Sequence, residues 1–271
     1  MSESELHATQ LEQLQEYDTA LLANLLGLVD TTPTHLVYMS NKIRSLLPEI
    51  GPTVGRAVTC ELDSSTPDHE ADGSNDGFWE QIAEMEAEAA PTIWVVSCVG
   101  SRPRHECVLG DGMGKALRAA GCVGVVTDGG VRDLEGLRSI AFGAYGTGVT
   151  IHHCRLRMRR LGVPVDVGGI TVSPQDVIHA GPEGVIRIPE SAVSTLLDQA
   201  PQYRAFEHEA HQLLRRTDIR GARKRELMGD IRKKYGYEDQ TKADNQGNKG
   251  EATKGTPTFQ TTGGSGDVSD A

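Results

Sequence analysis

The chain has 271 residues and a net charge of −11, from 27 Lys and Arg against 38 Asp and Glu. This length fits one large or two small domains, enough to fold around an apolar core without disulfides or a structural metal. The negative charge argues against binding to nucleic acid, because it would repel phosphates. No apolar run approaches the roughly 20 residues of a membrane-spanning helix, and the opening MSESE lacks the plan of a signal peptide. We therefore expect a soluble cytoplasmic protein without membrane or nucleic-acid partners.

The five cysteines predict neither a disulfide scaffold nor a zinc ribbon. They are odd in number, scattered along the chain, and contain no Cys-x-x-Cys pair. Free thiols in a reducing compartment explain them best.

The first third of the chain predicts helices and strands in alternation. Asp18 offers a cap that would split the first helical stretch into two. The acidic segment 63–88 contains nine acids and no Lys or Arg, and its first part, near 63–77, is a polar insertion. In chain order we expect helices over 6–28, a strand over 52–62, a loop over 64–77, a helix over 78–90 and a buried strand over 93–99.

The remainder predicts an α/β domain that ends in helices and a tail. A Gly-rich turn leads into a helix at 110–121, and a second buried strand begins at Cys122 and runs into a further helix. Residues 236–271 carry almost no apolar side chains and predict a disordered polar tail after a single domain over 1–235. Further strands are expected at 148–153, 163–167 and 185–189, and helices over 192–216, broken at Pro201, and on to Tyr235.

Polar residues follow two of the predicted strands. Gly110-Asp111-Gly112-Met113-Gly114-Lys115 opens a helix, but it fits neither the P-loop nor the dinucleotide fingerprint. Such a loop offers backbone N–H groups to an anion, while Asp111 could equally cap the helix. In Asp128-Gly129-Gly130-Val131-Arg132-Asp133, Asp133 could cap the next helix and Arg132 could form a surface ion pair. Alternatively, the two supply a carboxylate for a hard cation beside a guanidinium for an oxyanion.

The arrangement of these residues is more specific than each part. Twenty residues separate Asp111 from Arg132-Asp133, with a Gly-Asp loop before them and an Asp-Gly-x-Val-Arg-Asp segment at the end. This pattern resembles the RraA-like family, which includes class II pyruvate aldolases. The resemblance extends to Gly55–Thr59 and to Val172-x-Pro174-x-Asp176, where Gln175 stands in a position at which members often have glycine.

The resemblance implies a swivelling β/β/α sandwich that assembles as a homotrimer or hexamer. It also implies a lyase that cleaves 4-hydroxy-2-oxo acids to pyruvate, decarboxylates oxaloacetate, or does both, through a pyruvate enolate. Asp133 would hold Mg²⁺ or Mn²⁺ and Arg132 would contact the keto oxygen. Backbone N–H groups of Gly112, Met113 and Gly114 would hold the substrate carboxylate, and Asp111 would orient a water or transfer a proton.

Two other classes of function are open to a chain with this resemblance. Some relatives bind and inhibit ribonuclease E without catalysis, although a pure binding protein has no need to keep Asp111, Arg132 and Asp133 together. An old methyltransferase label in the family lacks support here, because no glycine fingerprint for adenosylmethionine is present.

Three further groups are weaker candidates. His152-His153-Cys154 resembles a metal cluster, but neighbouring residues on a strand face opposite sides. Arg155, Arg157 and Arg159 would alternate on one face of a strand, either solvated or subunit-facing, or turned toward an anion. Glu207 and Glu209 are candidates to complete the site of a neighbouring subunit.

Overall fold

The computed structural model describes residues 3–67, 76–153 and 155–237, so residues 238–271 of the predicted tail and residues 68–75 of the acidic insertion lie outside it. The chain divides into two compact units, Met1–Thr217 and Asp218–Ala271. Every described strand and every predicted site residue belongs to the first unit. The described part of the second unit contains α7 (Gly221–Tyr235). None of the described helices combines the length and hydrophobicity needed to cross a bilayer.

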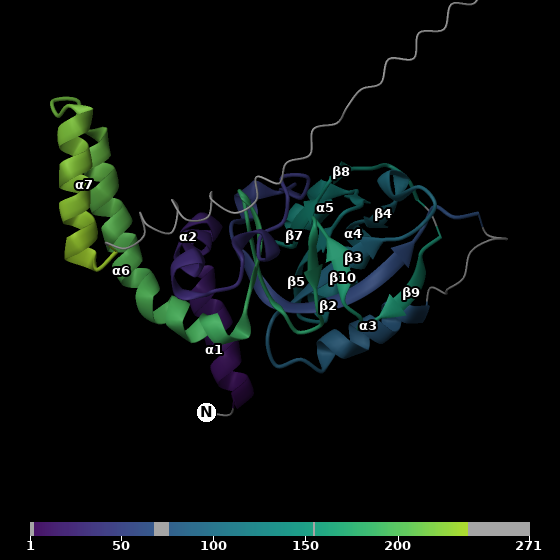
Figure 1. Cartoon of the computed structure of the whole chain (residues 1–271). Coiled ribbons are helices and arrows are strands. Elements are labelled where there is room, and N and C mark those ends of the chain that lie inside the picture. The colour runs from purple at the N-terminus through teal and green to yellow at the C-terminus, as the bar shows by residue number, and fades with distance from the viewer. Residues whose placement is uncertain (1–2, 68–75, 154, 238–271) are drawn as a thin grey trace, which may run out of the picture. The chain divides into compact units, whose positions relative to one another are not determined.

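An eight-stranded mixed sheet forms the centre of the first unit (Figure 1). Neighbouring strands from β7 to β2 are parallel, and the other pairs are antiparallel. In spatial order the strands are β1 (Arg44–Ser45), β7 (Gly143–Gly146), β5 (Cys122–Thr127), β3 (Thr92–Cys98), β2 (Thr53–Asp63), β12 (Val177–Gly181) and β13 (Gly184–Ile188), while β9 (Arg157–Leu161) also pairs with β2.

The central strands are buried on both faces, as the apolar run over 93–99 predicts. On β3, Trp94 and Val96 face a core shared with α3 (Asp76–Glu86), α4 (Asp111–Ala119) and α5 (Leu134–Ser139). Ile93 and Val95 face a second core shared with the hairpin β10 (Val165–Val167) and β11 (Ile170–Val172). Helices therefore cover one face of the sheet and a β-hairpin packs on the other, which confirms the expected β/β/α layers.

A separate parallel sheet of three short strands carries the candidate site. It consists of β4 (Cys107–Leu109), β6 (Gly130–Val131) and β8 (Gly148–Val149), in that order. β4 ends two residues before Asp111 and β6 ends directly before Arg132. The sequence does not predict β4 or β6, because two or three residues are too few to show a period. The strand expected over 148–153 is limited to the two residues of β8.

The N-terminal helices break where the sequence predicts. α1 (Glu3–Gln15) and α2 (Thr19–Val29) are separated at Asp18, whose Oδ1 accepts the Leu21 N–H at 2.8 Å. By contrast, the break expected at Pro201 is wrong, since α6 (Glu190–Arg215) runs through it. Leu196, Tyr203 and Phe206 of α6 are buried, and α6 packs against α2. That burial offsets the hydrogen bond lost at the proline. Three 3-10 turns complete the described elements, η1 (Thr34–Leu36), η2 (Pro48–Ile50) and η3 (Pro103–His105).

Of the three arginines predicted to alternate on a strand, Arg155 lies before β9 and is exposed, whereas Arg157 is buried and Arg159 is only partly accessible. Arg157 and Arg159 lie on β9 and share a face, but both form ion pairs with Asp63, whose side chain is fully buried. The Arg159 Nη1–Asp63 Oδ2 distance is 2.9 Å. Asp63, expected to begin the polar insertion, is therefore the last residue of β2 and part of the interior.

Candidate functional site

The structure brings Asp111, Arg132 and Asp133 together. Asp111 is the first residue of α4, and Arg132-Asp133 follows β6 directly. The Arg132 N–H donates to the Leu109 carbonyl at 3.1 Å, which joins the ends of β4 and β6. Asp133 Oδ2 lies 3.4 Å from the Asp111 N and 3.4 Å from Arg132 Nε. The spacing of twenty residues thus corresponds to one helix, one strand of the central sheet and a return to the neighbouring strand of the small sheet.

Two glycines make this approach possible. A Cβ on Gly110 would lie 2.4 Å from Asp133 Oδ2 and 2.8 Å from Arg132 Nε. A Cβ on Gly136 would lie 2.4 Å from the Asp111 Cβ. Asp133 itself has a φ of 57°, a conformation that costs most residues energy and that Asp tolerates better than most. The backbone is therefore shaped to turn the Asp133 carboxylate toward the start of α4.

Neither carboxylate caps its own helix through its side chain. Gly110 occupies the N-cap position of α4, so the capping interpretation of Asp111 is wrong. Asp133 occupies the N-cap position of α5 as predicted, but its side chain makes no capping bond to α5 and its Oδ2 accepts the Asp111 N–H instead. Both carboxylates remain partly exposed, with 37% and 44% of the side chains accessible.

Lys115 is the ion-pair partner of Asp111, which the sequence motifs do not predict. Its Nζ lies 2.6 Å from Asp111 Oδ2, one helical turn away. The Lys115 hydrogen bond, with smaller contributions from its charge, the Gly112 N–H and the Arg132 charge, lowers the pKa of Asp111 below its ordinary value. Asp111 is thus an ionised hydrogen-bond acceptor at neutral pH. The i, i+4 spacing of the two residues was the signal that could have revealed the pair.

The start of α4 offers two backbone donors rather than three. The Gly114 N–H donates to the Gly110 carbonyl at 3.0 Å, so it is already used by the helix. The N–H groups of Gly112 and Met113 lie in the first turn, where the helix backbone provides no acceptor, and the Gly112 N–H faces the Asp111 carboxylate. The space beside the Gly112 Cα is open, since an added Cβ would meet nothing within 4 Å. Gly114 instead allows close packing, because a Cβ there would lie 2.4 Å from Leu137 Cδ2.

Asp133 is the one predicted metal ligand at this place. Among the described residues, no three His, Cys, Asp or Glu side chains are placed to hold an ion together. His152 and His153 are exposed, and Cys154 lies outside the described residues. A single accessible carboxylate suits Mg²⁺ or Mn²⁺, hard ions that keep several waters and bind through one or two carboxylates plus substrate oxygens. The donor set therefore fits a hydrated divalent cation and not a zinc site, which needs more protein ligands.

Comparison with known proteins shows the family of the chain. The profile of the RraA-like family, described as Aldolase/RraA, matches residues 23–187, more than half of the chain. The chain belongs to the RraA-like family. A candidate 4-hydroxy-4-methyl-2-oxoglutarate aldolase of Halalkalibacterium halodurans is 30% identical over 133 residues, which cover 46% of this chain and 61% of that relative. The chain thus matches less than two thirds of the length of that relative.

Two more similarities extend over most of this RraA-like chain. An uncharacterized protein of Methanocaldococcus jannaschii is 24% identical over 66% of the chain and 82% of its own length. The crystal structure of RraAS2 from Streptomyces coelicolor, from the RNase ES inhibitor RraA protein family, superimposes with a TM-score of 0.58. It is 22% identical and covers 75% of this chain and 96% of its own. This structural similarity establishes the fold.

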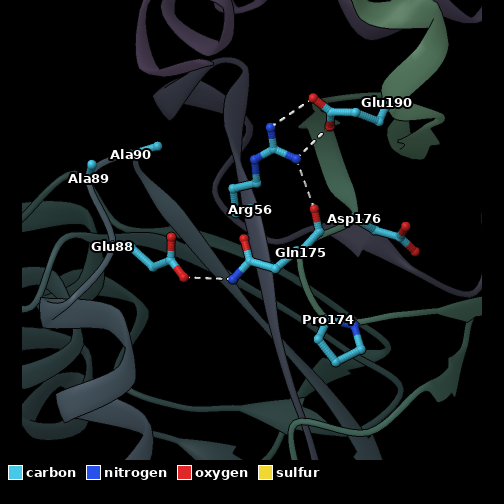
Figure 2. Close-up of a pocket in the computed structure, with 8 residues that line it drawn as sticks. All are labelled: Arg56, Glu88, Ala89, Ala90, Pro174, Gln175, Asp176 and Glu190. Atoms are coloured by element: carbon cyan, nitrogen blue, oxygen red, sulfur yellow. Dashed lines mark hydrogen bonds and ion pairs between the residues drawn. The ribbon is translucent and has the colours of Figure 1, made fainter. Parts of the chain in front are cut away.

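The other family motifs of the chain meet away from Asp111 and Arg132. Arg56, Gln175 and Glu190 line a cavity of about 470 Å³ (Figure 2). The Arg56 guanidinium donates to both carboxylate oxygens of Glu190 and to the Gln175 carbonyl, and Gln175 Nε2 donates to Glu88 Oε1 at 2.6 Å. Because these groups satisfy one another, the motif residues there join β2 to α6 and to the turn before β12. They offer no open charge to a ligand.

Proposed function

We propose that the chain is a divalent-metal-dependent lyase that acts on small 2-oxo acids. It would cleave 4-hydroxy-2-oxo acids of the 4-hydroxy-4-methyl-2-oxoglutarate type to pyruvate, decarboxylate oxaloacetate, or do both. The observation that carries the proposal is the convergence of the Arg132 guanidinium and the start of α4, with its Asp111 carboxylate, on the Asp133 carboxylate. Membership of the RraA-like family, which contains both aldolases and ribonuclease inhibitors, supports the same class of reaction.

The open side of α4 suits the carboxylate of a 2-oxo acid. The first-turn N–H groups of Gly112 and Met113 carry the positive end of the helix dipole, and no side chain fills the space beside Gly112. Asp133 would hold Mg²⁺ or Mn²⁺ at the same place, and the bound ion would supply a Lewis acid for the keto and carboxylate oxygens. Arg132, which lies beside Asp133, would then contact the keto oxygen.

Arg132 would stabilise the negative charge that forms during bond breaking. In aldol cleavage the C4 hydroxyl loses its proton and the C3–C4 bond breaks, and its electron pair forms the enolate of pyruvate. In decarboxylation of oxaloacetate the C3–C4 bond breaks with loss of CO₂ and produces the same enolate. Protonation at C3 then yields pyruvate in both cases. A guanidinium held in place before the reaction stabilises the enolate oxygen most strongly in the transition state.

Asp111 would act as an acceptor in the proton transfers. Its partner Lys115 keeps the carboxylate ionised, so it can orient a water and accept a proton, but it is a poor acid at neutral pH. The same ion pair holds Asp111 against Gly136 and so limits how far the carboxylate can move. Lys115 is in this view a positioning residue.

Pyruvate release tests the proposal directly. A panel of 4-hydroxy-2-oxo acids and oxaloacetate would be assayed with and without Mg²⁺ for the wild type and for Asp133→Asn and Arg132→Ala. We expect Asp133→Asn to abolish metal-dependent turnover and Arg132→Ala to lower kcat by about 10²–10³, with a smaller effect on KM. Arg138→Gln is the matched control. It removes an arginine of α5 whose exposed side chain pairs with Glu49, and it should keep wild-type kinetics.

Two outcomes would contradict this function. Full activity of Arg132→Ala on every substrate would exclude the enolate mechanism. Absence of pyruvate release from the wild type would favour a regulatory protein that binds a ribonuclease.

We also propose that the chain assembles as a homotrimer or hexamer, which sedimentation at micromolar concentration would test. A monomer would contradict the proposed assembly.

A further inference from the structure

A second, larger cavity of about 860 Å³ has a lining that includes none of Asp111, Arg132 and Asp133. Three exposed cations line it: Lys42 before β1, Arg44 at the start of β1, and Arg104 from η3. Asp128 and Thr147 contribute from the residues that follow β5 and β7, and the turn between β10 and β11 closes one side. The carboxyl ends of parallel strands are where α/β sheets commonly bind ligands.

The three cations have no carboxylate partner within the part of the chain that the structure describes. Lys42 and Arg104 make no ion pair there, and Arg44 donates only through Nε, to the Asn41 carbonyl at 3.2 Å. This is unexpected in a chain with a net charge of −11, in which carboxylates outnumber cations. Three like charges around one hollow repel each other, and a bound anion would remove that repulsion.

The segment that carries Lys42 and Arg44 is held firmly. The Met39 N–H donates to the Val185 carbonyl at 2.9 Å and the Ser40 N–H donates to the Gly168 carbonyl at 2.7 Å. Ile43 is buried between the two cationic residues, and Arg44 pairs with Gly146 across β1 and β7. A ligand would therefore find the backbone of this segment already ordered, which reduces the entropy lost on binding.

Asp128 provides the single negative charge of the lining. Its Oδ1 accepts the Cys98 N–H at 2.8 Å, which fixes the carboxylate at the end of β5. Thr147 is also engaged, since its Oγ1 donates to the Gly129 carbonyl at 2.9 Å. Three cations against one carboxylate leave an excess of two positive charges, enough to select a ligand with at least two negative charges.

We propose that this cavity binds the polyvalent anionic group of a small molecule, either a phosphate or a polycarboxylate. The site is separate from the Asp111–Arg132–Asp133 cluster, so the inference does not depend on the proposed lyase activity. Arg104 and Arg44 would contribute guanidinium groups that bind oxyanions through paired hydrogen bonds, and Lys42 would add a point charge.

Calorimetric titration of the full chain with inorganic phosphate and, separately, with citrate tests the inference. We expect one of the two anions to bind, with affinity that falls when the salt concentration is raised. Arg104→Gln and Lys42→Gln should each weaken that binding about tenfold. Arg118→Gln removes the same charge from an exposed position on α4, outside the cavity, and should leave the affinity unchanged. The anion that binds identifies the phosphate or the polycarboxylate as the ligand group.

Several results would overturn the inference. The first is failure of both anions to bind, and the second is equal binding by Arg104→Gln and wild type. The third is loss of binding in Arg132→Ala but not in the cavity variants, which would place the anion at the Asp111–Arg132–Asp133 cluster. Loss of anion binding as the protein concentration rises would indicate that a second copy of the chain fills the cavity. Circular dichroism of each variant would establish that it is folded.

Discussion

Gly136→Ala tests how α5 holds the site together. The new Cβ would lie 2.4 Å from the Asp111 Cβ and 2.7 Å from its Oδ2, so the start of α4 and α5 would have to separate. Overpacking of this kind costs about 1–3 kcal/mol, and replacing glycine by alanine within a helix returns about 0.5–1 kcal/mol. We therefore expect a net loss of about 0.5–2 kcal/mol in the free energy of unfolding. The melting temperature should fall by about 2–6 °C.

Urea denaturation would measure the loss of stability, and pyruvate release would measure the effect on the candidate site. Gly112→Ala is the internal control for stability, because its Cβ meets no atom within 4 Å and a helix gains from the alanine. It should be at least as stable as the wild type. The cause can be isolated by combining Gly136→Ala with Asp111→Gly, which removes the opposing Cβ. In the double variant Gly136→Ala should cost less than it does alone. Equal cost in both backgrounds, or a Gly136→Ala protein as stable as the wild type, would refute the packing argument.

Four further predictions concern stability. Gln175→Gly should raise the free energy of unfolding by about 0.5–1 kcal/mol in urea, because Gln175 has a φ of 69°, whereas Gln175→Ala should not. Burial raises the pKa of Glu106, whose Oε2 has no hydrogen-bond partner among the described residues, so ionisation of this carboxyl destabilises the fold as the pH rises. Glu106→Gln should therefore raise the melting temperature more at pH 8 than at pH 5. Burial acts to raise the pKa of Asp63, but hydrogen bonds from Thr66 and Ser65 and the charge of Arg157 lower it overall. The ionised carboxylate therefore stabilises the fold, and this stabilisation is lost as the pH falls. Asp63→Asn should lower the free energy of unfolding by about 3–5 kcal/mol at pH 7, measured by denaturant unfolding. Ending the chain after residue 237 should leave melting temperature and pyruvate release unchanged, and a large loss of either would show that the tail is structural.

Local patterns in the sequence determined the elements that carry their own signal. The run over 93–99 is apolar without alternation, which suits a strand buried on both faces, and β3 is buried over its whole length. Asp18 is predicted to be a helix cap because a short side chain with an acceptor oxygen just before an apolar helix commonly binds a first-turn N–H. The structure shows this bond, from the Leu21 N–H to Asp18 Oδ1. The spacing of Asp111 and Arg132-Asp133 identified the candidate site residues, because it matches the family pattern. The structure shows that the three residues lie together.

Other features depended on partners far along the chain, which no local pattern contains. β4 and β6 have three and two residues, and they form strands because β6 pairs with both β4 and β8. The alternation of Arg157 and Arg159 predicted a shared face correctly, but only the fold placed Asp63 opposite them, 94 residues or more away in sequence. Lys42, Arg44 and Arg104 come from two segments that the central sheet brings to one hollow. The periodicity of apolar residues in the sequence shows which face of a helix or strand is buried. The topology of the sheet determines which residue lies next to a charged side chain.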